Sequence, residues 1–188
     1  MSLALSNVKE LLKSLRDNDW YITAFDFSYN GICSTFMKEG LALFLLLLYK
    51  EKTLPKGLDS MLRRVVSGCG FRTDTFFEGI VLCKGKNECE LFWELFCKWK
   101  DESDISEEGY SEWMDMIERY ISVRTAGIMD ANHRNYYGEC AAYIAAYGEV
   151  CESRGIVGAK ADIMEKYKVK YSRRRAFHQE LRNYGMWK

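Results

Sequence analysis

Proline and long hydrophobic runs are scarce in this sequence. The 188-residue chain has one proline, Pro55. Apolar residues make up 48% of the sequence. It is therefore too hydrophobic to be disordered and long enough for one or two domains with a real core. The longest apolar run, residues 41–49, is far shorter than the roughly 20 residues that cross a bilayer, and residues 1–18 do not resemble a secretory signal. We expect no membrane partner and a cytoplasmic location.

Metal-ligand spacings are also missing. The seven cysteines are odd in number, no two of them form Cys-x-x-Cys, and the chain has only two histidines, His133 and His178. A structural zinc site is therefore not expected, and the sequence predicts no cofactor. Free cysteines behave as small hydrophobic residues, so most of them are predicted to pack in the core of a protein in a reducing compartment.

The N-terminal half shows strand patterns. Residues 20–29 alternate aromatic and β-branched side chains, and Asn30-Gly31 is typical of a hairpin that leads into a returning strand over residues 32–37. Residues 76–83 indicate a further strand. These patterns predict a small antiparallel sheet.

Helices are predicted in the same half. Residues 7–15 have an amphipathic pattern that follows a capping box. Residues 41–49 fit either a buried strand or a helix, and their Leu and Ala content favours the helix. Residues 58–66, after Pro55, have helical spacing that ends at the glycines of residues 67–70.

From residue 88 onward the sequence shows helical periodicity and no strand pattern. Two helices lie on either side of an acidic linker at residues 101–108, and a third is expected over residues 130–153. Small residues on one side of the third helix predict that it is the central one; these residues are Gly138, Ala141, Ala145 and Gly148. Gly155 is expected to end it as a left-handed cap, with another helix over residues 159–171. The fold predicted is thus α+β, with an α+β domain at residues 1–100 and an all-α helical bundle at residues 101–188.

The charges are balanced in number but not in position. The chain has 27 basic and 27 acidic residues, so no global field favours DNA or a membrane. Residues 154–188 nevertheless contain ten Lys or Arg and three acids, which gives 10 − 3 = +7 and leaves 17 − 24 = −7 for the rest. A basic region of this kind attracts phosphate backbones regardless of sequence.

A run of three arginines sharpens this prediction. Ser172 has the character of an N-cap, which would place residues 173–175 in the first turn of the last helix, where free backbone N–H groups and the helix dipole already favour an anion. Other basic side chains are predicted to share this surface. The candidate residues for binding a nucleic acid or another anion are Lys166, Lys170, Arg173, Arg174, Arg175, His178 and Arg182.

The leading interpretation is a non-enzymatic module whose basic end contacts a nucleic acid or a nucleoprotein. Solvated helix faces or internal ion pairs explain the same charges equally well. The nearby aromatic residues, by their spacing, indicate core packing more than base stacking, except for Trp187 at the chain end.

Two other functions stay open. A compact chain without a catalytic motif also suits a protein inhibitor or adaptor that acts on another protein machine by protein–protein contact, like phage-type anti-defence or anti-CRISPR antagonists. Alternatively, Cys69 between two glycines, with His133 as a base, suggests a cysteine-dependent enzyme.

The last third of the chain also resembles a known segment. Tyr-Tyr-Gly-Glu-Cys-Ala-Ala at residues 136–142, Gly-Glu at 148–149, Glu-Ser-Arg-Gly at 152–155 and Ser-Arg-Arg-Arg-Ala-Phe at 172–177 carry the resemblance. They are similar to the C-terminal helical segment that accompanies some bacterial SWIM zinc-finger proteins. The resemblance implies a helical interaction module from a nucleic-acid-related context. The Cys and His zinc ligands of the finger have no counterpart here, and no functional residue is transferred from that family.

Overall fold

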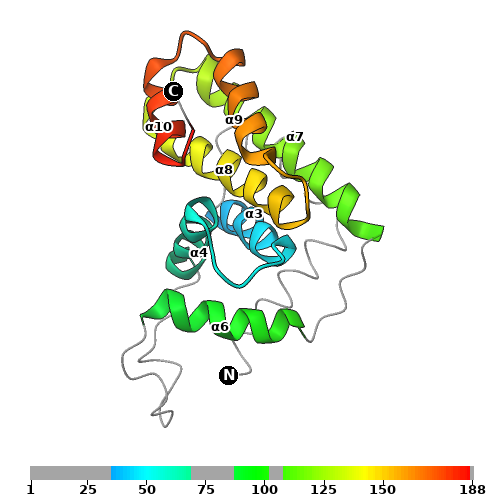
Figure 1. Cartoon of the computed structure of the whole chain (residues 1–188). Helices are drawn as coiled ribbons and strands as arrows, with labels where there is room; N and C mark the ends of the chain where they lie inside the picture. The colour runs from blue at the N-terminus through cyan, green and yellow to red at the C-terminus, as the bar shows by residue number, and fades with distance from the viewer. Residues whose placement is uncertain (1–34, 69–86, 102–107, 187–188) are drawn as a thin grey trace. The chain divides into compact units, whose positions relative to one another are not determined.

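The computed structural model describes residues 35–68, 87–101 and 108–186, and the regular elements in this part of the chain are all helical (Figure 1). The predicted α+β class is therefore wrong for the residues that the structure describes. The elements are α3 (Thr35–Leu48), α4 (Lys56–Gly68), α6 (Glu88–Asp101), α7 (Glu108–Asp130), the 3-10 turn η2 (Arg134–Tyr136), α8 (Tyr137–Ser153), α9 (Ala159–Lys170) and α10 (Arg175–Asn183).

The returning strand predicted for residues 32–37 is contradicted from Thr35 onward, because α3 begins there. Once a Leu- and Ala-rich segment forms a helix, each added residue gains a backbone hydrogen bond, so the helix extends cooperatively beyond the apolar run. The helix favoured for residues 41–49 is confirmed. The predicted strands at residues 20–29 and 76–83 and the helix at residues 7–15 lie outside the described residues.

The chain divides into two compact units. One comprises Met1–Phe44 and Leu62–Ile105, and the other comprises Leu45–Met61 and Ser106–Lys188. The second unit thus contains the basic C-terminal helices together with a segment from the first half of the sequence.

In the first unit, α6 begins with a reciprocal cap. The backbone N–H of Glu90 donates to the side-chain oxygen of Asn87 (2.9 Å), and the N–H of Asn87 donates to the Glu90 carboxylate (3.3 Å). This arrangement satisfies two donors that a helix start leaves free. Phe92 and Phe96, one helical turn apart on α6, are buried, and their ring centres lie 6.0 Å apart.

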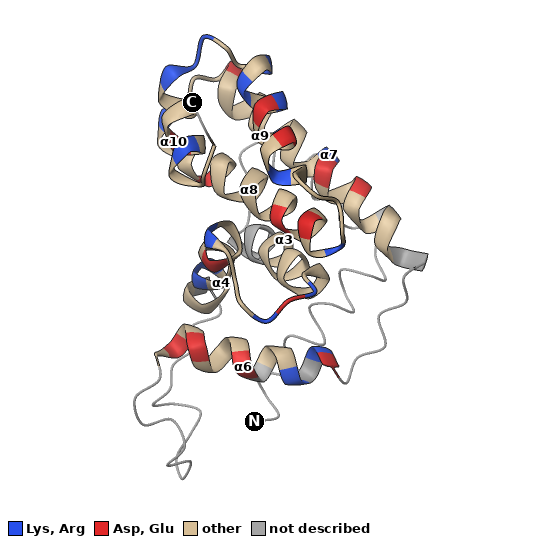
Figure 2. Cartoon of the chain, in the orientation of Figure 1, with Lys and Arg blue, Asp and Glu red and all other residues tan. Residues whose placement is uncertain are grey.

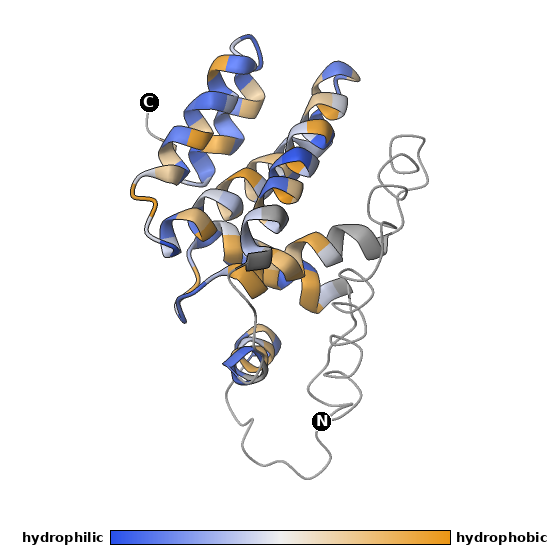
Figure 3. Ribbon diagram, turned by 90° about the vertical axis from the view of Figure 1, so that its right-hand side faces the viewer, coloured by the Kyte–Doolittle hydropathy of each residue, from blue (hydrophilic) through white to orange (hydrophobic). Residues whose placement is uncertain are grey.

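In the second unit, α8 is the central helix, as its small residues predict. It is buried along nearly its whole length and contacts α7, α9 and α10. A Cβ added to Gly148 would lie 2.5 Å from the Cα of Lys160, so the glycine lets α9 approach closely. The hydropathy of the residues alternates along the helices, as expected for helices with one buried face (Figure 3).

The predicted start of this helix at residue 130 is wrong, because α7 continues to Asp130 and α8 begins at Tyr137. The break lies at Asn132, which has a left-handed backbone (φ 55°). The N–H of Asn132 donates to Met129 O (3.2 Å) and that of His133 to Ile128 O (3.0 Å), which is a Schellman motif. Asparagine tolerates this conformation better than most residues do, so it can end a helix without a glycine.

The glycine cap expected at position 155 is confirmed. Gly155 has φ 92°, its N–H donates to Glu152 O (2.9 Å), and the N–H of Ile156 donates to Cys151 O (3.2 Å). Gly185 ends α10 in the same way, with φ 100°. Glycine is favoured at such positions because a Cβ is strained at positive φ.

Candidate functional site

The arginine run does not lie where the sequence predicts. Helix α10 begins at Arg175, its N-cap is Arg174, and no side chain caps it. The prediction that Ser172 caps the helix and that three arginines share its first turn is therefore wrong. Instead, the N–H of Arg174 donates to Tyr171 O (2.8 Å), so residues 171–174 form a turn between α9 and α10.

Arg174 joins this turn to the end of α7. Its guanidinium donates to the side-chain oxygen of Asn132 (2.7 Å) and to the carbonyl of Met129 (2.6 Å). Both acceptors belong to the Schellman end of α7, whose last carbonyls lack partners within the helix. Arg174 thus positions two loops next to each other: the α7–α8 loop (residues 131–136) and the α9–α10 loop (residues 171–174).

Two of the other candidates also make contacts within the protein. Lys166 pairs with the carboxylate of Glu118 across 2.8 Å on an exposed surface. The imidazole N–H of His178 donates to the carbonyl of Tyr171 (3.0 Å). Lys166 is thus the one candidate of the seven that pairs with a carboxylate of the described residues.

The remaining four candidates form no ion pair with the described residues. The Lys170 ammonium lies 5.5 Å from the centre of the Tyr171 ring, and Arg182 donates to the amide oxygen of Gln179 (3.3 Å). Arg173 and Arg175 are exposed, and neither forms a side-chain hydrogen bond or ion pair with the described residues. Lys and Arg residues gather along α10 and the chain that leads into it (Figure 2).

Of the aromatic residues that are predicted to pack in the core, Tyr167 and Phe177 are buried, whereas Tyr171 and Tyr184 are half-buried. Tyr137 and Tyr171 both meet Phe177 edge-on, with ring centres 5.8 and 6.0 Å away, and Tyr167 stacks on Tyr171 at 6.4 Å. Burial raises the pKa of the Tyr167 hydroxyl above its ordinary value. Tyr137, Tyr167 and Phe177 are buried and therefore not available for a base, Tyr171 is half-buried, and Trp187 lies outside the described residues.

Sequence reasoning missed the contribution of the α7–α8 loop. His133, Arg134 and Tyr136 are exposed beside Asn132, the residue that Arg174 holds. Asp130 is an exposed acid at the end of α7. Burial of Tyr171 is the main cause that raises the pKa of its hydroxyl, and the negative charge of Asp130 is the second cause. No local pattern could have indicated this neighbourhood, because it depends on a contact between residues 42 positions apart.

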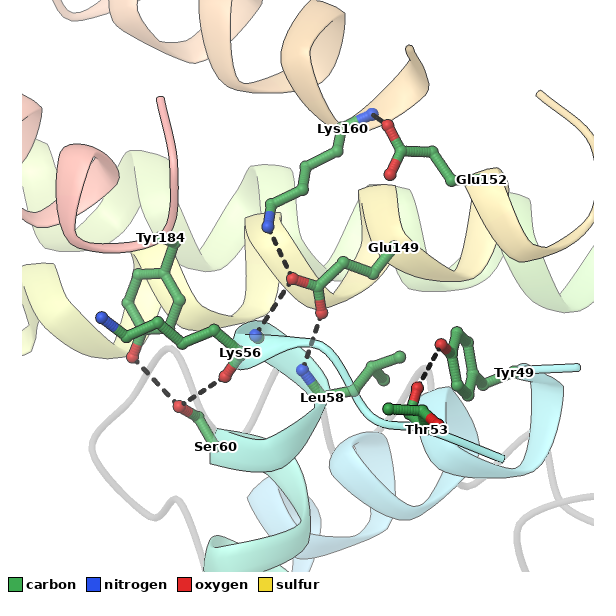
Figure 4. A network of polar contacts seen from close by, with 10 residues as sticks. Tyr49, Thr53, Lys56, Leu58, Ser60, Glu149, Glu152, Lys160 and Tyr184 are labelled. Carbon is green, nitrogen blue, oxygen red and sulfur yellow. Dashed lines mark hydrogen bonds and ion pairs between the residues drawn. The ribbon is translucent and has the colours of Figure 1, made fainter. Parts of the chain in front are cut away.

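Sequence reasoning also missed Glu149, which is buried at the centre of the second unit (Figure 4). Its carboxylate accepts the backbone N–H groups of Gly57 (3.0 Å) and Leu58 (2.8 Å) and pairs with the Lys160 ammonium (2.7 Å). The two N–H groups lie in the first turn of α4, where a helix has free donors. Glu149 is therefore the cap of α4, supplied by α8.

Lys160 and Arg154 are consequently structural cations. The backbone N–H of Lys160 also donates to Glu152 (3.2 Å) at the start of α9. Arg154 donates to the carbonyl of Leu48 (2.9 Å), and its guanidinium lies 3.7 Å from the centre of the Tyr110 ring. Some of the basic residues in 154–188 therefore make contacts inside the second unit, and others lie on its surface.

The described residues give little support to thiol or metal chemistry. Burial raises the pKa of Cys140 to about 11 and raises that of Cys151, which keeps both thiols protonated at neutral pH. Cys69 lies outside the described residues, so its pairing with His133 stays a prediction. Among the residues that the structure describes there is no cluster of His, Cys, Asp and Glu suited to a metal ion, and no helix long and apolar enough to span a membrane.

Comparison with known proteins gives no family. The chain matches no protein-family model, and neither the curated proteins nor the solved structures contain a significant match. The resemblance to the helical segment of SWIM proteins therefore stays a prediction.

Proposed function

We propose that the chain is a non-enzymatic binding module that contacts the phosphate backbone of a nucleic acid, alone or in a nucleoprotein, through the basic end of its second unit. The observation that carries the proposal is that Arg173 and Arg175 are exposed and unpaired with the described residues, on both sides of the fixed Arg174. Unpaired guanidinium groups can each donate two parallel hydrogen bonds to a phosphate.

The roles of the seven candidates then differ. Arg173, Arg175, Lys170 and Arg182 contact phosphates, because none of them pairs with a carboxylate of the described residues. Arg174 is a positioning residue, since its guanidinium bonds to Met129 and Asn132. His178 holds the Tyr171 carbonyl and Lys166 pairs with Glu118, so both lie at the margin of the surface.

Charge reversal tests this proposal. We expect the double variant Arg173→Glu/Arg175→Glu to lose binding to a fluorescein-labelled oligonucleotide by about tenfold or more at about 0.1 M salt, measured by fluorescence anisotropy. The matched control is Lys98→Glu/Arg119→Glu, which changes the net charge equally at exposed positions of α6 and α7.

The control separates a local surface from a general charge effect. The proposal requires the control double variant to bind within about threefold of the unchanged protein. Equal losses in both variants would mean that net charge alone attracts the oligonucleotide, and unchanged binding in the Arg173/Arg175 variant would refute the surface.

A protein inhibitor or adaptor is the second candidate, and one feature favours it. Ile156 and Val157, in the loop between α8 and α9, are 56% and 94% exposed, and they lie between two glycines with positive φ. Exposed apolar side chains in a tight loop suit a contact with another protein. A partner that is captured in stoichiometric amount after nuclease treatment, and lost with Ile156→Asp/Val157→Asp, would favour this function over nucleic-acid binding.

A further inference from the structure

Two aromatic rings of the second unit lie on its surface next to each other. His133 and Tyr136 in the α7–α8 loop have ring centres 6.2 Å apart and planes inclined by 37°. Both residues are exposed, and Tyr136 keeps 42% of its surface accessible. They contrast with Tyr137, the neighbouring residue, which is buried against Phe177.

The backbone fixes the position of this pair. The N–H of His133 donates to Ile128 O (3.0 Å) in the Schellman motif of α7, and the N–H of Tyr136 donates to His133 O (3.1 Å) in the 3-10 turn. Because short hydrogen-bonded turns leave the chain few conformations, the backbone that carries the two rings is ordered before a ligand binds.

The pair also lies beside the basic surface. Asn132, which precedes His133, accepts the hydrogen bond from Arg174, and Arg174 is flanked by the exposed Arg173 and Arg175. Arg134 follows His133, is exposed, and forms no side-chain hydrogen bond or ion pair with the described residues. Aromatic rings and unpaired cations from two loops are thus brought to one end of the unit by the contacts of Arg174.

We propose that His133 and Tyr136 form a stacking platform for an unpaired base, so that the ligand of the basic surface is a single-stranded nucleic acid. This inference rests on the proposed function. Proteins that bind single strands combine cations that follow the backbone with aromatic rings on which bases stack. In a duplex the bases are already stacked on one another. The phosphates of a duplex could therefore contact the arginines, but its bases could not stack on His133 and Tyr136.

Asp130 limits the path of the strand. Asp130 is the exposed last residue of α7, two positions before Asn132, and its carboxylate would repel a phosphate, so the backbone is expected to follow Arg173 and Arg175 instead. Asp130→Asn should therefore strengthen the binding of every phosphate-containing ligand by about twofold to fivefold, because one repulsive charge is removed.

Four oligonucleotide probes of about ten nucleotides, a length within the range of a small binding site, test the platform. They are a single-stranded DNA, a single-stranded RNA, a DNA duplex and a single-stranded DNA whose central nucleotides lack their bases. We expect both intact single strands to bind about tenfold more tightly than the strand without bases and the duplex. Tyr136→Ala should remove this difference, and Tyr136→Phe should keep it, because stacking needs the ring and not the hydroxyl.

The control and a second variant keep the result decisive. Val123→Ala truncates an apolar residue of α7 that is 41% exposed, and it should leave all four affinities unchanged. His133→Ala should reduce the preference for intact strands in the same direction as Tyr136→Ala, which covers the case in which the tyrosine variant does not fold.

The outcomes separate the inference from the proposed function. If intact and base-free strands bind equally, and Arg173→Glu/Arg175→Glu still weakens binding by about tenfold or more, the platform is refuted while the basic surface stands. If none of the four oligonucleotides binds to the unchanged protein, both proposals are refuted.

Discussion

Replacing Glu149 tests the internal organisation of the second unit. Glu149→Ala removes the acceptor of two backbone N–H groups in the first turn of α4 and the counter-ion of Lys160. The Glu149 side chain is 2% exposed and that of Lys160 is 20% exposed, so water replaces these contacts poorly. Breaking a buried, hydrogen-bonded ion pair by removing one partner costs about 3–5 kcal/mol. We expect Glu149→Ala to lower the free energy of unfolding by an amount in that range.

The assay is urea unfolding followed by circular dichroism, with Glu152→Ala as the matched control. Glu152 lies one helical turn further along α8, is exposed, and accepts one backbone N–H at 3.2 Å. Loss of such a helix-end contact costs about 0.5–2 kcal/mol. If Glu149→Ala costs no more than Glu152→Ala, the reasoning that α8 caps α4 through a buried carboxylate is refuted.

A double-mutant cycle isolates the ion pair from the cap. Lys160→Met removes the cation and keeps most of the side-chain volume, while Glu149 still accepts the N–H groups of α4. Because the two side chains are in direct contact, Glu149→Ala and Lys160→Met should show an interaction energy of at least about 1 kcal/mol, and additive effects would mean that the pair contributes no coupling.

Three further predictions concern packing, the loop contact and pH. Gly148→Ala should destabilise the protein by about 1–3 kcal/mol, because the new Cβ would meet the backbone of Lys160 at 2.5 Å; an unchanged urea midpoint would contradict the close approach. Arg174→Ala should increase hydrogen exchange at His133 and Asn132, since their loop loses two hydrogen bonds to the guanidinium, and equal protection in both proteins would contradict that role. The folded pKa of Cys140 is raised from 9.0 to about 11, so its contribution to stability is complete below pH 9.0 and is lost as the pH rises to about 11; Cys140→Ala should reduce this alkaline loss, measured by urea unfolding at several pH values.

Local patterns predicted those parts of the fold that depend on local forces. The Leu- and Ala-rich run became α3, the segment after Pro55 became α4, and Gly155 took the left-handed conformation that ends α8. In each case the signal is a backbone preference or a periodicity that acts within a few residues.

The errors arose where contacts between distant residues decide the structure. Ser172 has a side chain that is typical of an N-cap. However, Arg174 forms long-range hydrogen bonds, residues 171–174 form a turn, and α10 begins only at Arg175. The break at Asn132 was missed because asparagine enters the left-handed region only occasionally. The returning strand over residues 32–37 was predicted from an Asn-Gly pair, and its described residues joined the helix that follows.

The candidate site could be predicted only in part. The charge of residues 154–188 indicated Arg173 and Arg175 as candidates, and both are exposed. It could not distinguish them from Lys160, whose charge pairs with the buried Glu149. Composition gives the number of cations in a segment, whereas their availability depends on partners that lie far away in the sequence.

The central claim is that the basic end of the second unit binds phosphates, and the salt dependence of binding tests it most directly. Anisotropy titrations of a single-stranded oligonucleotide at several salt concentrations give the slope of the logarithm of the binding constant against the logarithm of the salt concentration. If Lys170, Arg173, Arg175 and Arg182 each neutralise one phosphate, the slope should be about −3. In the Arg173→Glu/Arg175→Glu variant the magnitude of the slope should decrease to about half or less, because two of the four phosphate contacts are lost. A slope near zero for the unchanged protein would contradict the account.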